Sequence, residues 1–566
     1  MESTTGPDLS PGEPHRRNFL GMLAALGCGA LAEKTIFGLD AHAQTVNSAA
    51  TPGGAVPALE SWLPNWPDMV EIWRNLSSEW AKLGLTLDLR QGTSATWQAQ
   101  IVGEHRMPHF ATMSWGGSPD RLDPDYFLYD LAHSDNLKPG GRNYGNYKNT
   151  AYDKLVEQQR LESNPAKRQQ FVREAQALFA KDNPSLVLFH RDIIQAYNKE
   201  KWEGVVSSYG AGIGTPYAPW SFVNMKSKSR RNALRVTTIY DIDLLNPFAN
   251  SRVHTQNMLR YIYPTLATRS PDAKIVPWVA QSWKEVDATT YDVTLRDGMT
   301  WHDGQPVTIQ DFKFTVDYIL KWKFTPLFSV SSVVDSVEIT GPRTLRFKLK
   351  RPFAPFTSNT LTTLFIAPKH IWEKVPGGTA ADFANEKAIG CGPFALGEWK
   401  KDQFLMLKAH KGFFNPPKMD ALYWLVVPSI ETQMGMLERG EADMLGWYID
   451  RNQGSRLAGQ KHLAVVETKT HGCHEIRMNM AMAPLNDPAF RLALQHATDR
   501  KKLLTIVFGG AGTLSNNSYI SPDLKEWTNT ELAAKVPEPS LDKARAVLKT
   551  AGYTWGPDNK LRFPQK

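Results

Sequence analysis

Cysteine is scarce in this chain, with three residues among 566, at positions 28, 391 and 473. So few cysteines exclude a small fold held together by several disulfides. Cys391 and Cys473 lie far apart in the sequence, and we expect two free, buried thiols, although an oxidising compartment would permit a disulfide between them. His471 and His474 flank Cys473 without regular ligand spacing, so the sequence predicts no metal site.

The short motifs of common enzyme classes are also missing. The chain has no Gly-x-Ser-x-Gly, no His-Glu-x-x-His, no Walker loop, no convincing Gly-x-Gly-x-x-Gly and no paired-cysteine motif. We therefore expect no catalytic residues, no enzyme activity and no cofactor.

Long apolar runs are absent after the first residues, so we expect no membrane span in the rest of the chain. Residues 1–43 have the features of a twin-arginine export signal: His15-Arg16-Arg17-Asn18-Phe19-Leu20, an apolar run to Ala32, and a small-x-small cleavage site at Ala41-His42-Ala43. A lipoprotein signal at Cys28 is disfavoured because Ala25 replaces the usual large apolar residue. The sequence thus predicts export to the periplasm by the twin-arginine pathway, with residues 44–56 as a linker.

No single charge sign dominates any long stretch, although the formal net charge is +8 and the pI is about 9.1. Lys and Arg are mixed with Asp and Glu, and basic residues do not alternate with aromatic ones as in RNA-binding modules. We expect a basic, well-solvated surface and no nucleic-acid partner.

The most informative stretch runs from Leu259 to Phe314. Within it, apolar residues at 291, 293 and 295 alternate with polar ones, which predicts a half-buried strand. Asp297-Gly298 is a hairpin turn signal that Asp303-Gly304 repeats. Thr308 and Asp311 have the spacing of a helix cap.

Further motifs follow downstream. They are Ile389-Gly-Cys-Gly-Pro-Phe394 with Glu398-Trp399, Lys411–Phe414, Leu437–Asp443, Asn479–Asp487 with Phe490–Arg500, and Leu541–Tyr553. With the 259–314 stretch, they resemble the extracytoplasmic solute-binding proteins of peptide/nickel-type ABC importers, family 5. In this comparison Cys391 replaces a threonine of the family's Gly-Thr-Gly-Pro-Tyr element.

The order of these segments differs from that of the family. The elements that should follow residue 566 resemble residues 57–225 instead, including Trp115-Gly-Gly-Ser118, Asp123-Pro124-Asp125 and Asn164–Arg168. A basic stretch at 226–232 joins them to what resembles the first strand of the family, at Leu234. The chain is therefore interpreted as a circular permutant, since domain termini commonly lie close together. Two alternatives remain open: a fusion of partial copies that complete one another between chains, and a degraded locus whose product does not fold.

The resemblance implies an α/β, two-lobed periplasmic binding protein fold with a hinge (type II, large cluster C-like), in circularly permuted order. We expect crossings between the lobes near Phe189–Ala196 and near Leu445–Gly472. The predicted division is as follows: 1–43 signal, 44–56 linker, 57–190 C-terminal part of lobe two, 191–225 return strand region of lobe one, 226–232 permutation linker, 233–445 lobe one, and 446–566 first part of lobe two.

The same resemblance implies the function. We expect a periplasmic substrate-binding component that captures a peptide or other small organic solute between its lobes and delivers it to an ABC permease in the inner membrane. A monomer is expected, and a swapped dimer stays open. The alternatives are a nickel or metal-chelate binding protein of the same fold and a non-functional rearranged relic.

Positions that match the ligand-binding positions of the family are the candidate site residues: Tyr240, Asp241, Cys391, Trp447, His474, Trp115, Ser118 and Asp120. Ser118 stands where peptide binders carry an aspartate that pairs with the α-ammonium of the peptide. Because an unpaired buried ammonium is costly, either Asp120 takes over that role or the ligand is not a free-amine peptide. Asp123 and Asp125 are expected to be turn and cap residues.

Overall fold

A computed structural model describes residues 50–118, 121–250 and 252–565. The predicted signal, Cys28, part of the linker and Asp120 lie outside these residues. Within them, no helix is both long enough and apolar enough to cross a bilayer.

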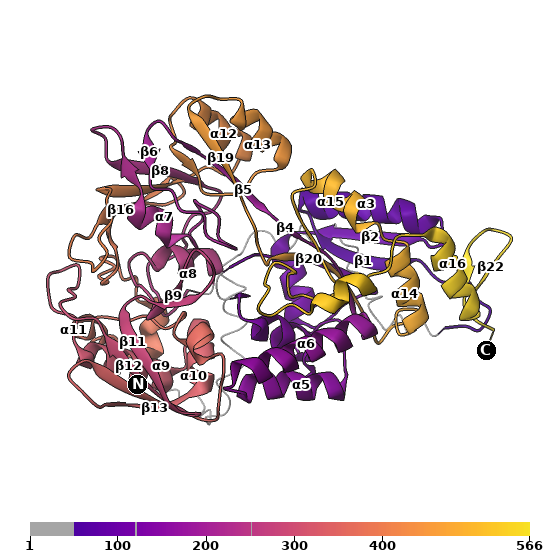
Figure 1. Cartoon of the computed structure of the whole chain (residues 1–566), viewed down its shortest axis with the longest axis horizontal. Coiled ribbons are helices and arrows are strands. Elements are labelled where there is room, and N and C mark those ends of the chain that lie inside the picture. Colours follow the sequence, from indigo (N-terminus) through magenta and orange to yellow (C-terminus); the bar gives the residue numbers. More distant parts are fainter. Residues whose placement is uncertain (1–49, 119–120, 251, 566) are drawn as a thin grey trace, which may run out of the picture. The chain divides into compact units, whose positions relative to one another are not determined.

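The described residues contain two large mixed β-sheets (Figure 1). The six-stranded sheet has the order β2 (Leu87–Gly92), β1 (Leu59–Pro64), β3 (Phe110–Trp115), β20 (Cys473–Met478), β4 (Ser185–Arg191) and β21 (Gly512–Leu514). The seven-stranded sheet has the order β15 (Phe394–Lys400), β16 (Phe404–Ala409), β17 (Ala421–Val426), β8 (Ala233–Thr238), β18 (Met444–Leu445), β5 (Ile193–Asn198) and β19 (Leu463–Thr468). The six-stranded sheet therefore combines strands from both ends of the chain, and the seven-stranded sheet lies within residues 193–468.

Smaller sheets and the helices complete the fold. A four-stranded sheet has the order β11 (Ala280–Asp287), β12 (Thr290–Leu295), β14 (Thr344–Leu349) and β13 (Val334–Ile339). Three further sheets have two strands each: β9 (Ala267–Arg269) with β10 (Ile275–Pro277), β6 (Trp202–Glu203) with β7 (Lys226–Ser227), and β22 (Thr554–Trp555) with β23 (Leu561–Arg562). The helices of seven or more residues are α3 (Pro67–Ala81), α5 (Thr150–Leu161), α6 (Pro165–Asp182), α8 (Val253–Leu259), α9 (Ile309–Trp322), α12 (Ile430–Glu438), α13 (Arg451–Ala458), α14 (Pro488–His496), α15 (Arg500–Phe508) and α16 (Leu541–Thr550).

Side-chain alternation gives the six-stranded sheet a core on each face. In β4, Leu186 and Leu188 pack into one core while Val187 packs into the other, as the two-residue period of a strand requires. The first core includes residues of α3, α14, α15 and α16, and the second includes residues of α5 and α6. Figure 1 accordingly shows α3 and α5 on opposite sides of this sheet.

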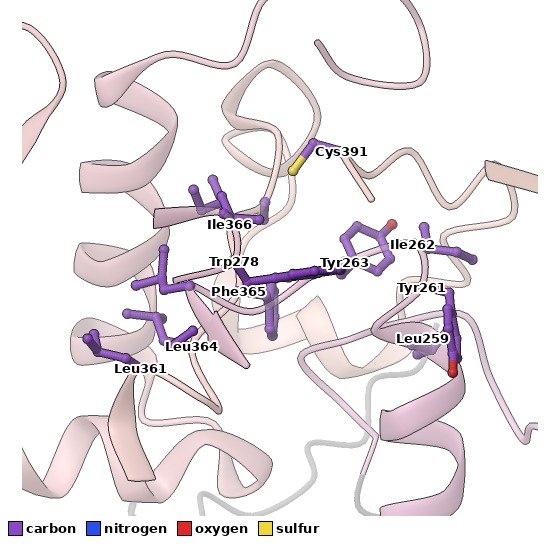
Figure 2. Packing of buried hydrophobic residues seen from close by; sticks show 14 of the residues in the cluster. Leu259, Tyr261, Ile262, Tyr263, Trp278, Leu361, Leu364, Phe365, Ile366 and Cys391 are labelled. Carbon is purple, nitrogen blue, oxygen red and sulfur yellow. The ribbon is translucent and has the colours of Figure 1, made fainter. Parts of the chain in front are cut away.

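A third and larger core underlies the seven-stranded and four-stranded sheets (Figure 2). The alternation predicted for 291–295 is present, because Tyr291, Val293 and Leu295 of β12 are buried in this core. The predicted cap is also confirmed: Thr308 and Asp311 form a capping box at the start of α9.

The structure contains the turn predicted at Asp303-Gly304 but not the hairpin predicted at Asp297-Gly298. Gly298 and Gly304 both have positive φ, at 68° and 87°. Only the second closes a tight turn, where Thr300 bridges to Pro306. The hairpin reading of Asp297-Gly298 is wrong, because β12 pairs with β11 through the turn at 288–289 and with β14 on its other edge.

The chain passes between the two large sheets at two points. Asp192 separates β4 from β5, and residues 469–472 separate β19 from β20. Both points lie within the ranges expected from the sequence. β19 and α13, which the boundary at 446 assigns to lobe two, pack with the seven-stranded sheet instead, because β19 pairs along its whole length with β5.

The first and last described segments lie side by side. Gly53 N donates to Pro564 O at 3.1 Å, Phe563 N to Gly54 O at 2.9 Å, and Val56 N to Leu561 O at 2.8 Å. Gly84, with φ of 82°, lets residues 559–561 approach the end of α3, because a Cβ there would lie 2.3 Å from Asn559 O.

Candidate ligand site

The two crossings are tied together by an ion pair. Lys469 Nζ lies 2.9 Å from Asp192 Oδ2, and the Asp192 side chain is almost fully buried. Burial raises the pKa of the Asp192 carboxyl, and the hydrogen bond from Lys469 opposes that rise. The pair therefore fixes the two crossings relative to one another.

The predicted loop after β3 lies beside the second crossing. Trp115 at the end of β3 is buried, and its Nε1 donates to Glu475 Oε1 at 2.6 Å. Ser118 is also buried, and its carbonyl oxygen lies 3.0 Å from His471 Nε2. The ring of His471 stacks on Tyr209 with 5.7 Å between centroids. Thus Trp115 and Ser118 are positioned by side chains of the 471–475 segment.

A cavity of about 610 Å³ begins where this loop ends. Its walls come from both parts of the fold, with Tyr209, Arg269 and Lys274 on one side and Leu122, Arg168 and Trp527 on the other. The remaining charged side chains that line it are Asp123, Glu162, Asp272, Glu285, Asp523, Lys525 and Glu526. A cavity with both charge signs fits a small polar solute with separated positive and negative groups better than a purely apolar one.

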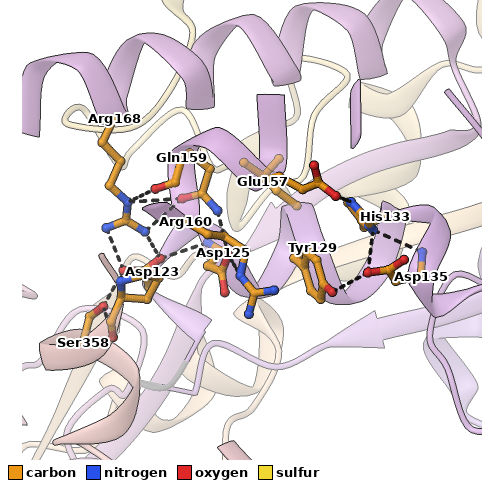
Figure 3. A network of polar contacts seen from close by, with 12 residues as sticks. Asp123, Asp125, Tyr129, His133, Asp135, Glu157, Gln159, Arg160, Arg168 and Ser358 are labelled. Atoms are coloured by element: carbon orange, nitrogen blue, oxygen red, sulfur yellow. Dashed lines mark hydrogen bonds and ion pairs between the residues drawn. The ribbon is translucent and has the colours of Figure 1, made fainter. Parts of the chain in front are cut away.

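Asp123 and Asp125 hold the wall of this cavity rather than presenting free carboxylates (Figure 3). Arg168 binds Asp123 through both terminal nitrogens, at 2.6 and 3.2 Å, and Ser358 Oγ donates to the same carboxylate. Asp125 accepts from Gln159 Nε2 at 2.6 Å and faces Arg160 Nε at 3.1 Å. Asp125 N also donates to Asp123 Oδ1, which agrees with the predicted turn role.

Two other predicted residues, Tyr240 and Trp447, lie together in a group of aromatic rings. Tyr240 contacts Trp447 with 5.4 Å between centroids, and His254 touches both rings. Tyr240 is 48% exposed, so this group has an open side. Tyr240 and Trp447 are not among the residues that line the 610 Å³ cavity.

His474 anchors a polar contact that the sequence did not predict. Its Nε2 lies 3.1 Å from Asp68 Oδ2, in the first turn of α3. Burial acts to raise the pKa of Asp68, but His474 and the Arg191 guanidinium lower it to about 2. Arg191 also lies over the ring of Tyr448, 3.8 Å from its centroid, and Tyr448 stacks on Trp447. Asp68 and Arg191 belong to segments more than a hundred residues apart, so no local motif indicates them.

Asp241 and Cys391 have mainly structural contacts. Asp241 accepts hydrogen bonds from Trp399 Nε1 at 3.1 Å and from Asp402 N at 2.7 Å. Cys391 is buried in the large core of Figure 2, where burial raises the pKa of its thiol. Cys473 is buried too, and both thiols are free. The prediction that Asp241 and Cys391 contact a ligand stays a prediction.

Comparison with known proteins identifies the family of this chain. Residues 274–566 match the model described as "Bacterial extracellular solute-binding proteins, family 5 Middle". The glutathione-binding protein GsiB of Salmonella typhi is 27% identical over 319 residues, which is 55% of this chain and 60% of that protein. The oligopeptide-binding protein AppA of Bacillus subtilis is 27% identical over 327 residues, 56% of this chain and 59% of that protein. The matched part therefore spans about 60% of the length of these relatives.

Two solved structures also align with part of this chain. AppA from Bacillus subtilis, in complex with a nonapeptide, aligns with a TM-score of 0.47 and 25% identity over 59% of this chain and 67% of that one. NikZ from Campylobacter jejuni, in complex with Ni(L-His), aligns with a TM-score of 0.49 and 22% identity over 60% of this chain and 66% of that one.

Proposed function

We propose that this chain, which belongs to family 5 of the bacterial extracellular solute-binding proteins, captures a small polar organic solute outside the cytoplasm and delivers it to an ABC permease. Relatives named for binding glutathione and oligopeptides support this proposal. Ligand would stabilise one arrangement of the two lobes, which the permease then recognises, as expected for a hinged binder.

One observation supports the proposed class of solute. The 610 Å³ cavity beside the crossings is lined from both parts of the fold and contains both acidic and basic side chains. A short peptide or a similar zwitterion carries charges that can be matched in such a cavity, whereas a purely apolar solute would displace water from the charged side chains without replacing its polar contacts. Trp115 and Ser118 are not among the residues that line this cavity. We propose that they position the loop that leads to it, and that Tyr240 and Trp447 contact a larger ligand or the closed lobe.

The direct test is to purify the mature protein, measure its mass by light scattering, and identify small molecules released on denaturation by mass spectrometry. A monomer that releases a peptide or another charged organic molecule would support the proposal. A protein that releases nothing and binds neither glutathione nor a peptide library in titration calorimetry would contradict it.

Tyr209 is the cavity residue whose removal should weaken binding most clearly. Replacing it with alanine removes a ring that lines the cavity and stacks on His471, and we expect the solute affinity to fall about tenfold. Tyr209→Phe should retain most of the affinity, and Trp322→Ala, which removes a 39% exposed ring on α9, should leave it unchanged. A loss with Trp447→Ala but none with Tyr209→Ala would place the solute at the aromatic group instead.

We also propose that the chain is a circular permutant that folds on itself. The antiparallel contact between residues 53–56 and 561–564 supports this, because a short peptide could connect the two ends there. A rearranged chain with residue 565 linked to residue 50 by a few glycines, and with new ends opened inside 226–232, should fold to a monomer with an unfolding midpoint within a few degrees of the original. Failure of this variant to fold, with a dimeric parent, would favour exchange between chains.

Export by the twin-arginine pathway is a further proposal. It rests on Arg16-Arg17 in the first 43 residues. Replacing both by lysine should leave the precursor in the cytoplasm, which cell fractionation would detect. Normal export of that variant would refute the pathway.

A further inference from the structure

A second cavity lies in the part of the fold that contains the six-stranded sheet, among helices from both of its faces. It has a volume of about 960 Å³ and lies between α6, α14, α16 and a short helix at Thr530–Lys535. α14 and α16 pack against each other along one wall (Figure 1). It shares no lining residue with the 610 Å³ cavity.

The walls of this second cavity are apolar and its charges have one sign. Leu178, Leu492, Leu532 and Val547 supply the apolar surface, and Leu492 is 40% exposed. Lys181 and Lys535 are the charged side chains among its lining residues, and none of the lining residues is acidic. Lys535 has an exposed partner in Glu531, at 3.8 Å.

Two residues that line this cavity carry buried polar atoms without partners within the described ranges. Gln495 on α14 is 4% exposed, and its Nε2 has no hydrogen-bond partner in the part of the chain that the structure describes. Asn183, which ends α6 in a left-handed conformation, donates to Arg491 O but leaves its Oδ1 unpaired among the described residues. Buried polar groups are normally paired, and the unpaired donor of Gln495 can be satisfied by an acceptor that enters from the cavity.

A buried cation lies behind the same wall. Asn517, which lines the cavity, accepts a hydrogen bond from Arg500 Nη2, and Arg500 is 6% exposed. Arg500 Nε and Nη1 have no partner among the described residues. A buried guanidinium without a carboxylate is unfavourable, and a nearby anion would stabilise it.

From these observations we propose that the second cavity binds a medium-chain aliphatic carboxylate. The alkyl chain lies along Leu178, Leu532 and Val547, and the carboxylate accepts a hydrogen bond from Gln495 Nε2 on the side of Asn517 and Arg500. Lys181 and Lys535 favour an anion at the rim. This site is independent of the solute site proposed above.

The test uses decanoate and decan-1-ol as probes, in titration calorimetry with the mature protein. We expect one decanoate per chain, and decan-1-ol should bind at least about tenfold more weakly, because a hydrogen bond to a charged group is stronger than one to a neutral group. Gln495→Met keeps the side-chain volume but removes the donor, and should weaken decanoate binding about tenfold.

Two further variants separate this site from the candidate solute site. Leu532→Trp should fill the cavity and abolish decanoate binding, while an unchanged midpoint of urea unfolding shows that the variant folds. Equal affinities for decanoate and decan-1-ol would overturn the proposal, as would decanoate binding that Leu532→Trp leaves unchanged or that Tyr209→Ala abolishes.

Discussion

Lowering the pH from 7 to 5 is expected to cost this protein about 5 kcal/mol of unfolding free energy. Burial lowers the pKa values of His109, His190, His254 and His302 to about 4. The unfolded chain binds these protons near pH 6.5, so the stability that the neutral histidines contribute is complete above that pH and is lost as the pH falls toward 4. Each of the four histidines lowers the unfolding free energy by about 2 kcal/mol between pH 7 and pH 5.

Two carboxylates act in the opposite direction. Burial raises the pKa values of Asp130 and Asp192 to about 6, so protonation of the folded state offsets part of the loss over the same range. Asp130 is more than a third exposed, which reduces its effect. The histidine effect remains larger because four groups contribute to it.

Urea unfolding followed by tryptophan fluorescence at pH 7 and pH 5 measures this difference. His190→Gln replaces a fully buried ring by a group that does not titrate. Between pH 7 and pH 5, the unfolding free energy of this variant should therefore fall by about 2 kcal/mol less than that of the wild-type protein. His462→Gln, a change at a partly exposed position, is the control. Equal stability of the wild-type protein at both pH values, or an unaltered pH dependence in His190→Gln, would refute the prediction.

Breaking the ion pair between Glu475 and Arg477 should lower the unfolding free energy by about 3–5 kcal/mol. Both side chains are buried, and Arg477 binds Glu475 through Nε at 3.0 Å and Nη2 at 2.8 Å. Trp115, Ser185 and Tyr519 donate to the same carboxylate, at 2.6, 2.6 and 2.5 Å. Although burial tends to raise the pKa of Glu475, Arg477 and these donors hold it below its usual value.

Arg477→Met leaves this carboxylate buried without its counter-ion, which is the origin of the expected loss. Chemical unfolding measures it. In the double variant Glu475→Leu with Arg477→Met, part of the stability should return, because neither charge is then unpaired. Arg439→Ala breaks an exposed pair with Glu441 and should leave the unfolding free energy essentially unchanged. An Arg477→Met variant as stable as Arg439→Ala would contradict the argument.

Sequence reasoning works best for features that depend on neighbouring residues. The capping box of α9 and the alternation of β12 follow from residues within four positions of each other. Asp297-Gly298 shows the limit of such reasoning: it has the residues and the positive φ of a turn, but the pairing partners of β12 determine where the hairpin lies.

The candidate site depends mostly on distant contacts. The contact between Asp68 and His474 joins residues 406 positions apart, and nothing near either residue indicates it. Cys391 matches a family motif, but the direction of its side chain follows from packing of Gly390 and Gly392 against the backbone of Ile262 and Tyr261. Local patterns therefore predict elements and motifs, while side-chain partners require the folded chain.

The pairing of β3 with β20 has a consequence for protein synthesis. Trp115 lies opposite Cys473, so β1 and β3 leave the ribosome long before the strand that completes their sheet. The hydrophobic faces of these strands and of α3 remain without that partner until more than three hundred further residues have been translated. Pairing over such a separation is slow, and the exposed strands are prone to aggregation in the meantime. We therefore expect the nascent chain to depend on chaperones, and a short pause in translation before β20 to lower the yield of native protein.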